Sequence, residues 1–149
     1  MEQLIGVTAF LIIGYGFGTY LEGKHYSSIR RRENRYLKKP AINMRKLPLV
    51  GKEIDSSKLA IGSTVISVDY YKRFLANLKM IFGGRMTSYE SLLDRARREA
   101  LLRMKENARD ADLFLNVKIE TSSISKGSNE KSVGSIEAVA YSTAIKFKA

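Results

Sequence analysis

Near the N-terminus, the residues from Gln3 to Leu21 form a run without any charged side chain. As a helix these 19 residues would extend about 28 Å, close to the ~30 Å hydrocarbon core of a bilayer. A cleaved signal peptide would need a basic start and a small-residue cleavage site, and neither is present. A buried core helix is the other alternative. Because a basic segment follows the run, as it does after a stop-transfer helix, the pattern predicts a transmembrane anchor over residues 1–23.

After residue 60 the pattern of apolar and polar positions first alternates and then takes on a helical period. Ser63–Val68 is β-branched and alternating, which predicts a strand. Asp69 is suited to cap a helix over 70–82, where apolar residues recur at the spacing of one helix face. Gly83 and Gly84 then end this helix.

A second helix is predicted from Thr87 to about Arg109, because Thr87 and Glu90 have the spacing of a capping box. Its apolar stripe consists of Tyr89, Leu93, Ala96, Ala100, Met104, Ala108 and Ala111. The small alanine side chains imply a close approach to a neighbouring element. The opposite face is expected to be solvated and carries the i, i+4 pairs Asp94–Arg98 and Glu99–Arg103.

Two long strands are predicted next, at Leu113–Ile124 and Val133–Phe147, joined by a polar loop. The order β-α-α-β-β predicts a small α+β domain, in which both helices lie on one face of an antiparallel sheet. Such a small sheet leaves its other face and its edges unprotected in a monomer. We therefore expect a homo-oligomer.

The predicted elements divide the chain into three parts: an anchor at 1–23, a basic helix and linker at 24–60, and a folded domain at 61–149. The chain has two prolines, Pro40 and Pro48, and both lie in the linker.

The positive charge is concentrated directly after the uncharged run. The chain carries 26 Lys and Arg against 15 Asp and Glu, a net charge of +11, and residues 24–46 alone sum to +8. By the positive-inside rule the N-terminus would face outward and the folded domain would be cytoplasmic, as in a single-pass protein of a bacterial plasma membrane. Lipid headgroups would then contact Lys24, Arg30, Arg31, Arg32 and Arg35. The alternative is that these residues only set the topology. Nucleic acid is not expected as a partner.

Two glycines of the uncharged run, Gly14 and Gly18, are spaced i, i+4. Such a small-xxx-small face lets helices approach closely. The pair therefore predicts packing between the anchor helices of different copies.

The residue types that the chain contains exclude several classes of catalytic and metal-binding site. The chain has no cysteine and a single histidine, His25. Disulfides, thiolate catalysis, Cys-ligated metals and a Ser-His-Asp triad are therefore excluded. We find no carboxylate pair with a base and no nucleophile with an activator, so an enzyme is not expected.

One group of neighbouring residues remains as a candidate site: Gly83, Gly84, Arg85, Thr87 and Ser88. Free backbone N–H groups, a helix N-terminus and a guanidinium together suit an anion. The alternative is a sharp turn between two helices, in which Arg85 pairs with an acidic group of the next subunit.

Several short motifs resemble the YbjQ-like family, which is often labelled "putative heavy-metal-binding". They are Phe82-Gly83-Gly84-Arg85, Ser88-Tyr89-Glu90, Ala96-Arg97-Arg98-Glu99-Ala100, Asn116-Val117 and Ala140-Tyr141-Ser142-Thr143-Ala144. The N-terminal part, with His25-Tyr26-Ser27-Ser28-Ile29 and Arg32-Glu33, is similar to a membrane-tethered branch of that family. The resemblance implies a ring-shaped homo-oligomer, typically a pentamer, without established enzymatic activity. Asp110 and Ser142 depart from it, since the family usually has glycine at both positions.

The description "putative heavy-metal-binding" does not suit the residues of the predicted domain. Soft heavy metals prefer thiolates and imidazoles, and the predicted domain has neither. We expect no metal site and no cofactor.

Two functions of different classes follow. The first is a membrane-tethered scaffold, in which a homo-oligomeric ring (a pentamer or a multiple of it) presents a platform to another membrane or cytoplasmic protein. The second is a ligand-binding or sensory module that uses clefts between subunits, with an anion at the Gly83-Gly84-Arg85 turn.

Overall fold

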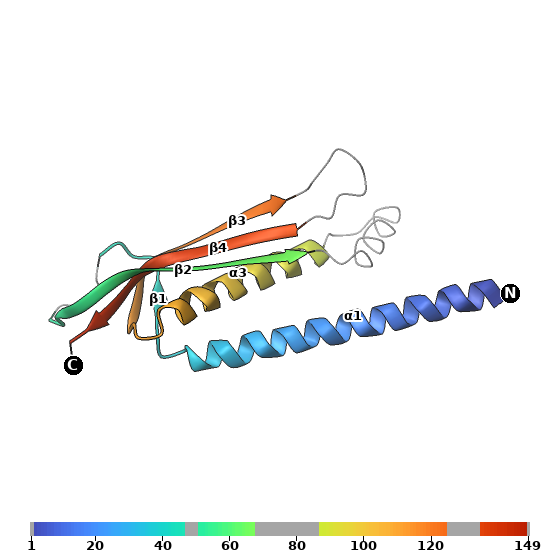
Figure 1. Cartoon of the computed structure of the whole chain (residues 1–149), viewed down its shortest axis with the longest axis horizontal. Helices are drawn as coiled ribbons and strands as arrows, with labels where there is room; N and C mark the ends of the chain where they lie inside the picture. Colours follow the sequence, from blue (N-terminus) through green and yellow to red (C-terminus); the bar gives the residue numbers. More distant parts are fainter. Residues whose placement is uncertain (1, 47–50, 68–86, 125–134, 149) are drawn as a thin grey trace.

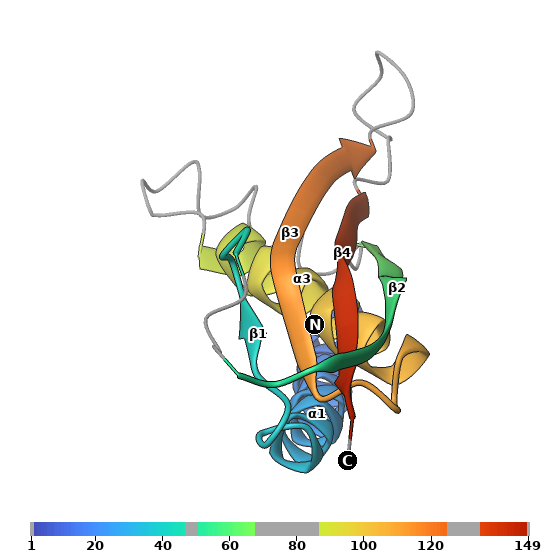
Figure 2. The ribbon, with the colours of Figure 1, turned by 90° about the vertical axis from the view of Figure 1, so that its left-hand side faces the viewer.

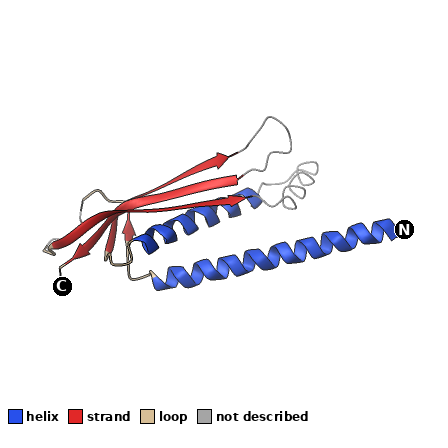
Figure 3. Cartoon of the chain, viewed as in Figure 1, coloured by secondary structure: helices blue, strands red, loops and turns tan. Residues whose placement is uncertain are grey.

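The computed structural model describes residues 2–46, 51–67, 87–124 and 135–148 (Figure 1). Its elements, coloured by type in Figure 3, are α1 (Glu2–Arg35), β1 (Ala41–Ile42), β2 (Ile54–Ser67), α3 (Thr87–Asn107), β3 (Leu113–Ile124) and β4 (Ser135–Phe147). They form a small α+β domain with α1 extending beyond it. The helix predicted at 70–82 and the turn after it lie outside the described residues.

The four strands form one mixed sheet in the order β1-β3-β4-β2. β2 and β3 both pair antiparallel with β4, as predicted, whereas β1 pairs parallel with β3. The segment around β1 is held to β3 by two backbone hydrogen bonds: Phe114 N–H donates to Pro40 O at 2.9 Å and Asn116 N–H to Met44 O at 3.0 Å. A two-residue strand has no periodicity of its own, so the sequence could not predict it.

β2 extends further toward the N-terminus than predicted. Its first half shows no alternation of apolar and polar residues, so the pattern could not predict this part of the strand. The predicted strand began at Ser63, but β2 begins at Ile54 and pairs with β4 along its length. Its first six residues are exposed, so backbone pairing to β4 holds them rather than side-chain burial. The predicted boundary between residues 60 and 61 consequently falls inside a strand.

α3 packs on one face of the sheet, and α1 lies on the same side (Figure 2). The core between α3 and the sheet is built mainly from alanines, including Ala96 and Ala100 of α3, Ala108 directly after it, and Ala138, Ala140 and Ala144 of β4. The larger side chains of Phe114, Met104 and Ile136 fill the space around them. The alanine stripe predicted to allow a close approach is therefore confirmed.

The closest approach between α3 and the sheet is at Gly62 of β2. A Cβ atom added there would lie 2.1 Å from Met104 N and 2.4 Å from Ala100 O. Both are backbone atoms of α3, so the helix lies directly on the strand and no side chain fits between them.

β3 contains a bulge opposite the middle of β4. Leu115 pairs with Thr143 and Lys118 with Tyr141, so Asn116 and Val117 together oppose a single residue. Asn116 has φ 54°, a left-handed conformation that asparagine tolerates better than most residues. The bulge places the N–H of Asn116 toward Met44 O, where it helps to hold the segment that follows β1.

The expected membrane anchor is corrected by the structure. Within the part of the chain that the structure describes, no helix is long and apolar enough to cross a bilayer. A run without charge is not necessarily an apolar run: between Gly14 and Tyr20 every residue except Phe17 is glycine, tyrosine or threonine. The expected single-pass membrane location was therefore wrong.

Candidate functional site

Among the described segments, none covers the sheet face opposite α3 along much of β2 and β4. Cross-strand pairs place Ile61 beside Tyr141 and Leu59 beside Thr143 on this face. Leu59, Ile61 and Val65 are 64%, 47% and 58% exposed. We call the surface formed by Leu59, Ile61, Val65, Val139 and Tyr141 the open sheet face. Figure 1 shows both helices on its far side.

The open sheet face also has a polar border on β3. Tyr141 Oη donates a hydrogen bond to Glu120 Oε1 at 2.6 Å. This bond raises the pKa of Tyr141, because removing the phenolic proton would leave two anions in contact. Lys118 pairs with Tyr141 across the strands. An apolar strip next to a polar border is typical of protein contact surfaces.

Glu99 of α3 is buried at the contact with α1, only 5% exposed. Its carboxylate accepts hydrogen bonds from Arg32 of α1 and, at 3.0 Å, from Arg103. Burial alone would raise the pKa of Glu99, but the two arginines outweigh burial and hold it below its ordinary value. The carboxylate is therefore charged at neutral pH and connects the two helices.

A second ion pair lies beside this one. Arg98 of α3 donates two hydrogen bonds to Glu33 of α1, at 2.8 and 2.6 Å. This bidentate pairing lowers the pKa of Glu33. We call the two ion pairs, Arg32–Glu99 and Glu33–Arg98, the α1–α3 clamp.

An apolar cluster and a hydrogen bond support the clamp. Ile29 of α1 and Tyr36, directly after α1, pack with Leu102 of α3, and Ile29 is fully buried. Tyr26 Oη donates to Ser91 O at 3.1 Å. Tyr26, Ile29 and Tyr36 are spaced i, i+3, i+10, as on one face of a helix, and this spacing is a signal in the sequence that predicts packing of α1.

The face of α3 predicted to be solvated is covered by α1 only in part: Asp94 and Arg103 have side chains 57% and 50% exposed, whereas Glu99 is buried. Both i, i+4 pairs exist, Asp94–Arg98 at 3.6 Å and Glu99–Arg103 at 3.0 Å. Arg98, however, makes its shorter bonds to α1, and Glu99 is buried. Charge pairs on one helix do not show whether a second helix covers them.

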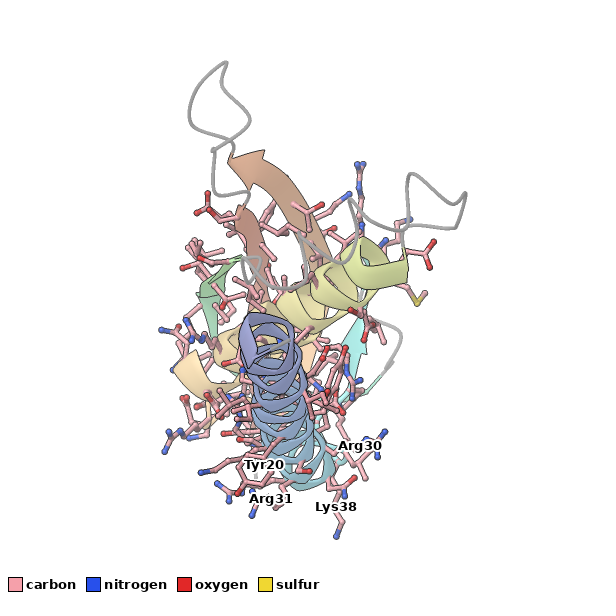
Figure 4. The ribbon with its side chains drawn as sticks, turned by 90° about the vertical axis from the view of Figure 1, so that its right-hand side faces the viewer. Tyr20, Arg30, Arg31 and Lys38 are labelled. Atoms are coloured by element: carbon pink, nitrogen blue, oxygen red, sulfur yellow. The ribbon has the colours of Figure 1, made fainter. Side chains whose placement is uncertain are left out.

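The residues expected at lipid headgroups do not act as one group. Arg32 is engaged in the α1–α3 clamp, whereas the exposed members are Lys24, Arg30, Arg31 and Arg35. Figure 4 shows Arg31 on the side of α1 that faces away from the sheet and Arg30 projecting sideways from the helix. Their assignment to headgroups depended on the anchor and is withdrawn with it.

The glycine turn expected to bind an anion, Gly83 to Arg85, lies outside the described residues. Thr87 and Ser88 begin α3, and their side chains are likewise outside the description. Gly14 and Gly18 lie within α1. A Cβ added at Gly18 meets no atom within 4 Å, so nothing in the described chain packs there.

The described residues do not fit a heavy metal. They contain no group of three or more His, Asp or Glu side chains placed to hold an ion. Burial lowers the pKa of His25, and the charge of Arg95 lowers it further. A metal cation at this imidazole would meet the same repulsion.

The profile of a protein family described as "Putative heavy-metal-binding" (YbjQ) matches residues 44–148. A UPF0145 protein of Clostridium novyi is 37% identical over 98 residues, covering 64% of this chain and 88% of that protein. One from Methanosarcina acetivorans is 35% identical over 101 residues, covering 66% and 89%. A solved structure of a DUF74-family protein of unknown function from Pediococcus pentosaceus is 15% identical, covers 74% of this chain and 94% of its own, and has a TM-score of 0.36.

Proposed function

The chain belongs to the YbjQ family, and we propose that within it this protein is a self-assembling scaffold. In this proposal copies of the domain form a homo-oligomeric ring, a pentamer or a multiple of it, and the ring presents a platform to another protein. The observation that carries the proposal is the open sheet face, with three large aliphatic side chains of β2 in solvent.

The physical argument is the cost of leaving this face in water. Burying one Leu, Ile or Val side chain fully is worth about 1.5–3 kcal/mol, and the open sheet face exposes about half or more of three of them. The opposite face is already filled by α3. A second copy of the domain is a natural cover, because the same apolar strip recurs on every copy.

The edge of the sheet supports the same conclusion. β2 is an edge strand of 14 residues, and the other edge, β1, has only two. A long edge offers backbone N–H and C=O groups to a further strand. Contacts that pair different surfaces of identical subunits close into rings when the rotation between subunits permits it.

The test is the mass of the full chain in solution, measured by light scattering and native mass spectrometry. We expect an integral multiple of 16.8 kDa. The double variant I61K/V65K places two charges on the open sheet face and should reduce the mass to that of one chain. The matched control is L37K, since Leu37 is also a large aliphatic residue, 73% exposed, but lies after α1.

The control should keep the wild-type mass. A wild-type chain that remains monomeric at every concentration would refute the scaffold. An I61K/V65K variant with the wild-type mass and an unchanged circular dichroism spectrum would show that assembly uses another surface.

A further inference from the structure

A basic hollow lies at the end of the domain where α1 ends, β3 begins and β4 ends, near the C-terminus in Figure 1. Its volume is about 670 Å³, within the range of small-molecule sites. The side chains and backbone that line it come from Lys38, Lys39, Pro40, Lys52, Asp112, Leu113, Lys146, Phe147 and Lys148. These residues are far apart in the sequence, and the fold brings them together.

The lining carries five lysines against one aspartate, so its formal charge is 5 − 1 = +4. Glu53, beside the hollow, forms an ion pair with Lys148 at 2.7 Å, which leaves +3. Asp112 uses one carboxylate oxygen to accept the N–H of Phe147 at 3.0 Å. The charge that surrounds the hollow is therefore compensated only in part by the described residues.

The individual lysines differ in how they are engaged. Lys39 Nζ donates to the backbone carbonyl of Arg109, a partner without net charge. Lys52 Nζ lies 5.4 Å from the centre of the Phe147 ring. Lys38 and Lys146 are both exposed. The charge of Lys146 helps to lower the pKa of Asp110, whose carboxylate forms its ion pair with Lys58 at 2.6 Å. Figure 4 shows Lys38 reaching outward from the end of α1.

The hollow also has an apolar part. Leu113 is 3% exposed and packs with Leu115 and Ile145, and Phe147 packs against the same cluster. Of these, Leu113 and Phe147 line the hollow together with Pro40, and they form its apolar floor. A ligand that matches both parts of the hollow must carry negative charge at several points. It must also have an apolar or aromatic portion.

From this geometry we propose that the basic hollow binds a small organic phosphate with more than one phosphate group, such as a nucleoside polyphosphate. Several ammonium groups on separate stems suit a chain of phosphates, because each lysine is a point charge that can reach a different oxygen. A single carboxylate would leave most of the charge uncompensated. This site shares no residue with the Gly83-Gly84-Arg85 motif or with the open sheet face.

The experiment is isothermal titration calorimetry of the full chain at about 50 mM salt, where surface charges are weakly screened. The probes are ATP, inorganic tripolyphosphate and adenosine. We expect ATP and tripolyphosphate to bind and adenosine not to bind. Tighter binding of ATP than of tripolyphosphate would support a contribution of the apolar floor, and equal binding would support recognition of the phosphates alone.

Two substitutions test the position of the site. K38Q and K146Q should each weaken ATP binding about three- to fivefold, the effect of one exposed ionic contact, and the double variant about tenfold or more. The matched control is K24Q, because Lys24 is also exposed but lies on α1 away from the hollow. None of these changes touches the open sheet face, so the result is independent of the proposed assembly.

Three results would overturn the proposal. One is the absence of heat for both polyphosphates at low salt. Another is wild-type affinity in the K38Q/K146Q variant with an unchanged circular dichroism spectrum. The third is an equal loss of affinity in K24Q, which would mean that net charge rather than the hollow attracts the anion.

Discussion

At Gly62 the backbones of α3 and β2 lie so close together that no side chain, not even a Cβ atom, fits between them. The groups in the way are Met104 N and Ala100 O, and a helix backbone cannot yield as a flexible side chain can. Substitutions at this position therefore act on the placement of the whole helix.

We predict that G62A lowers the free energy of unfolding by about 1–3 kcal/mol or more, because α3 must move away from the sheet. Urea denaturation followed by circular dichroism measures this. G18A is the matched control, since a Cβ at Gly18 meets open space and alanine favours a helix. If G62A were as stable as the wild type, α3 would not rest on β2 as described.

At Asn116 the backbone conformation, rather than a close contact, restricts replacement of the residue. Its φ of 54° at the bulge is strained for a β-branched side chain. We predict that N116V lowers the free energy of unfolding by about 1–2 kcal/mol, whereas N116G is tolerated. Thermal unfolding of the two variants compares them directly. Equal loss in both would indicate that the asparagine side chain, not the backbone angle, matters.

At the scale of elements, the periodicity of the sequence predicted the helix and the strands that bury one regular face against the core. α3, β3 and β4 were all expected near their observed bounds. The first half of β2 was missed, because backbone pairing rather than side-chain burial holds it. β1 was missed because two residues are too few to show a periodicity, although Ala41 and Ile42 pack against the core. The packing of α1 on α3 was missed as well, although Ile29 and Tyr36 have the required spacing.

The α1–α3 clamp should make the contact between these helices depend on pH. The pKa values of Glu33 and Glu99 are both lowered in the folded chain from an ordinary value of 4.5. Their contribution to stability is therefore fully present above about pH 4.5 and is lost as the pH falls through the lowered values. We predict that acidification from pH 7 to about pH 3 lowers the melting temperature, measured by circular dichroism.

The variant E33Q/E99Q should show a smaller decrease over the same range. D94N serves as the control, because Asp94 is 57% exposed and lies 3.6 Å from Arg98. It should retain the wild-type pH dependence. An equal decrease in all three chains would assign the pH dependence to carboxylates outside the clamp.

At the scale of the whole molecule, the distribution of charge was visible in the sequence but its meaning was not. Residues 24–46 carry +8, which suggested a membrane flank. In the fold, Arg32 joins two helices, whereas Lys38 and Lys39 line the basic hollow. Counting charges along a chain cannot show these roles, because they depend on Glu99 and Lys146, which come from distant strands and helices.

The α1–α3 clamp has a final consequence for how the molecule opens. α1 is held by a few ion pairs and one small apolar cluster, whereas β4 is paired on both sides at the centre of the sheet. We therefore expect α1 to detach sub-globally while the sheet and α3 remain intact. Detachment would bring the buried carboxylate of Glu99 and the side chain of Leu102 into water and would expose a surface that the closed structure conceals.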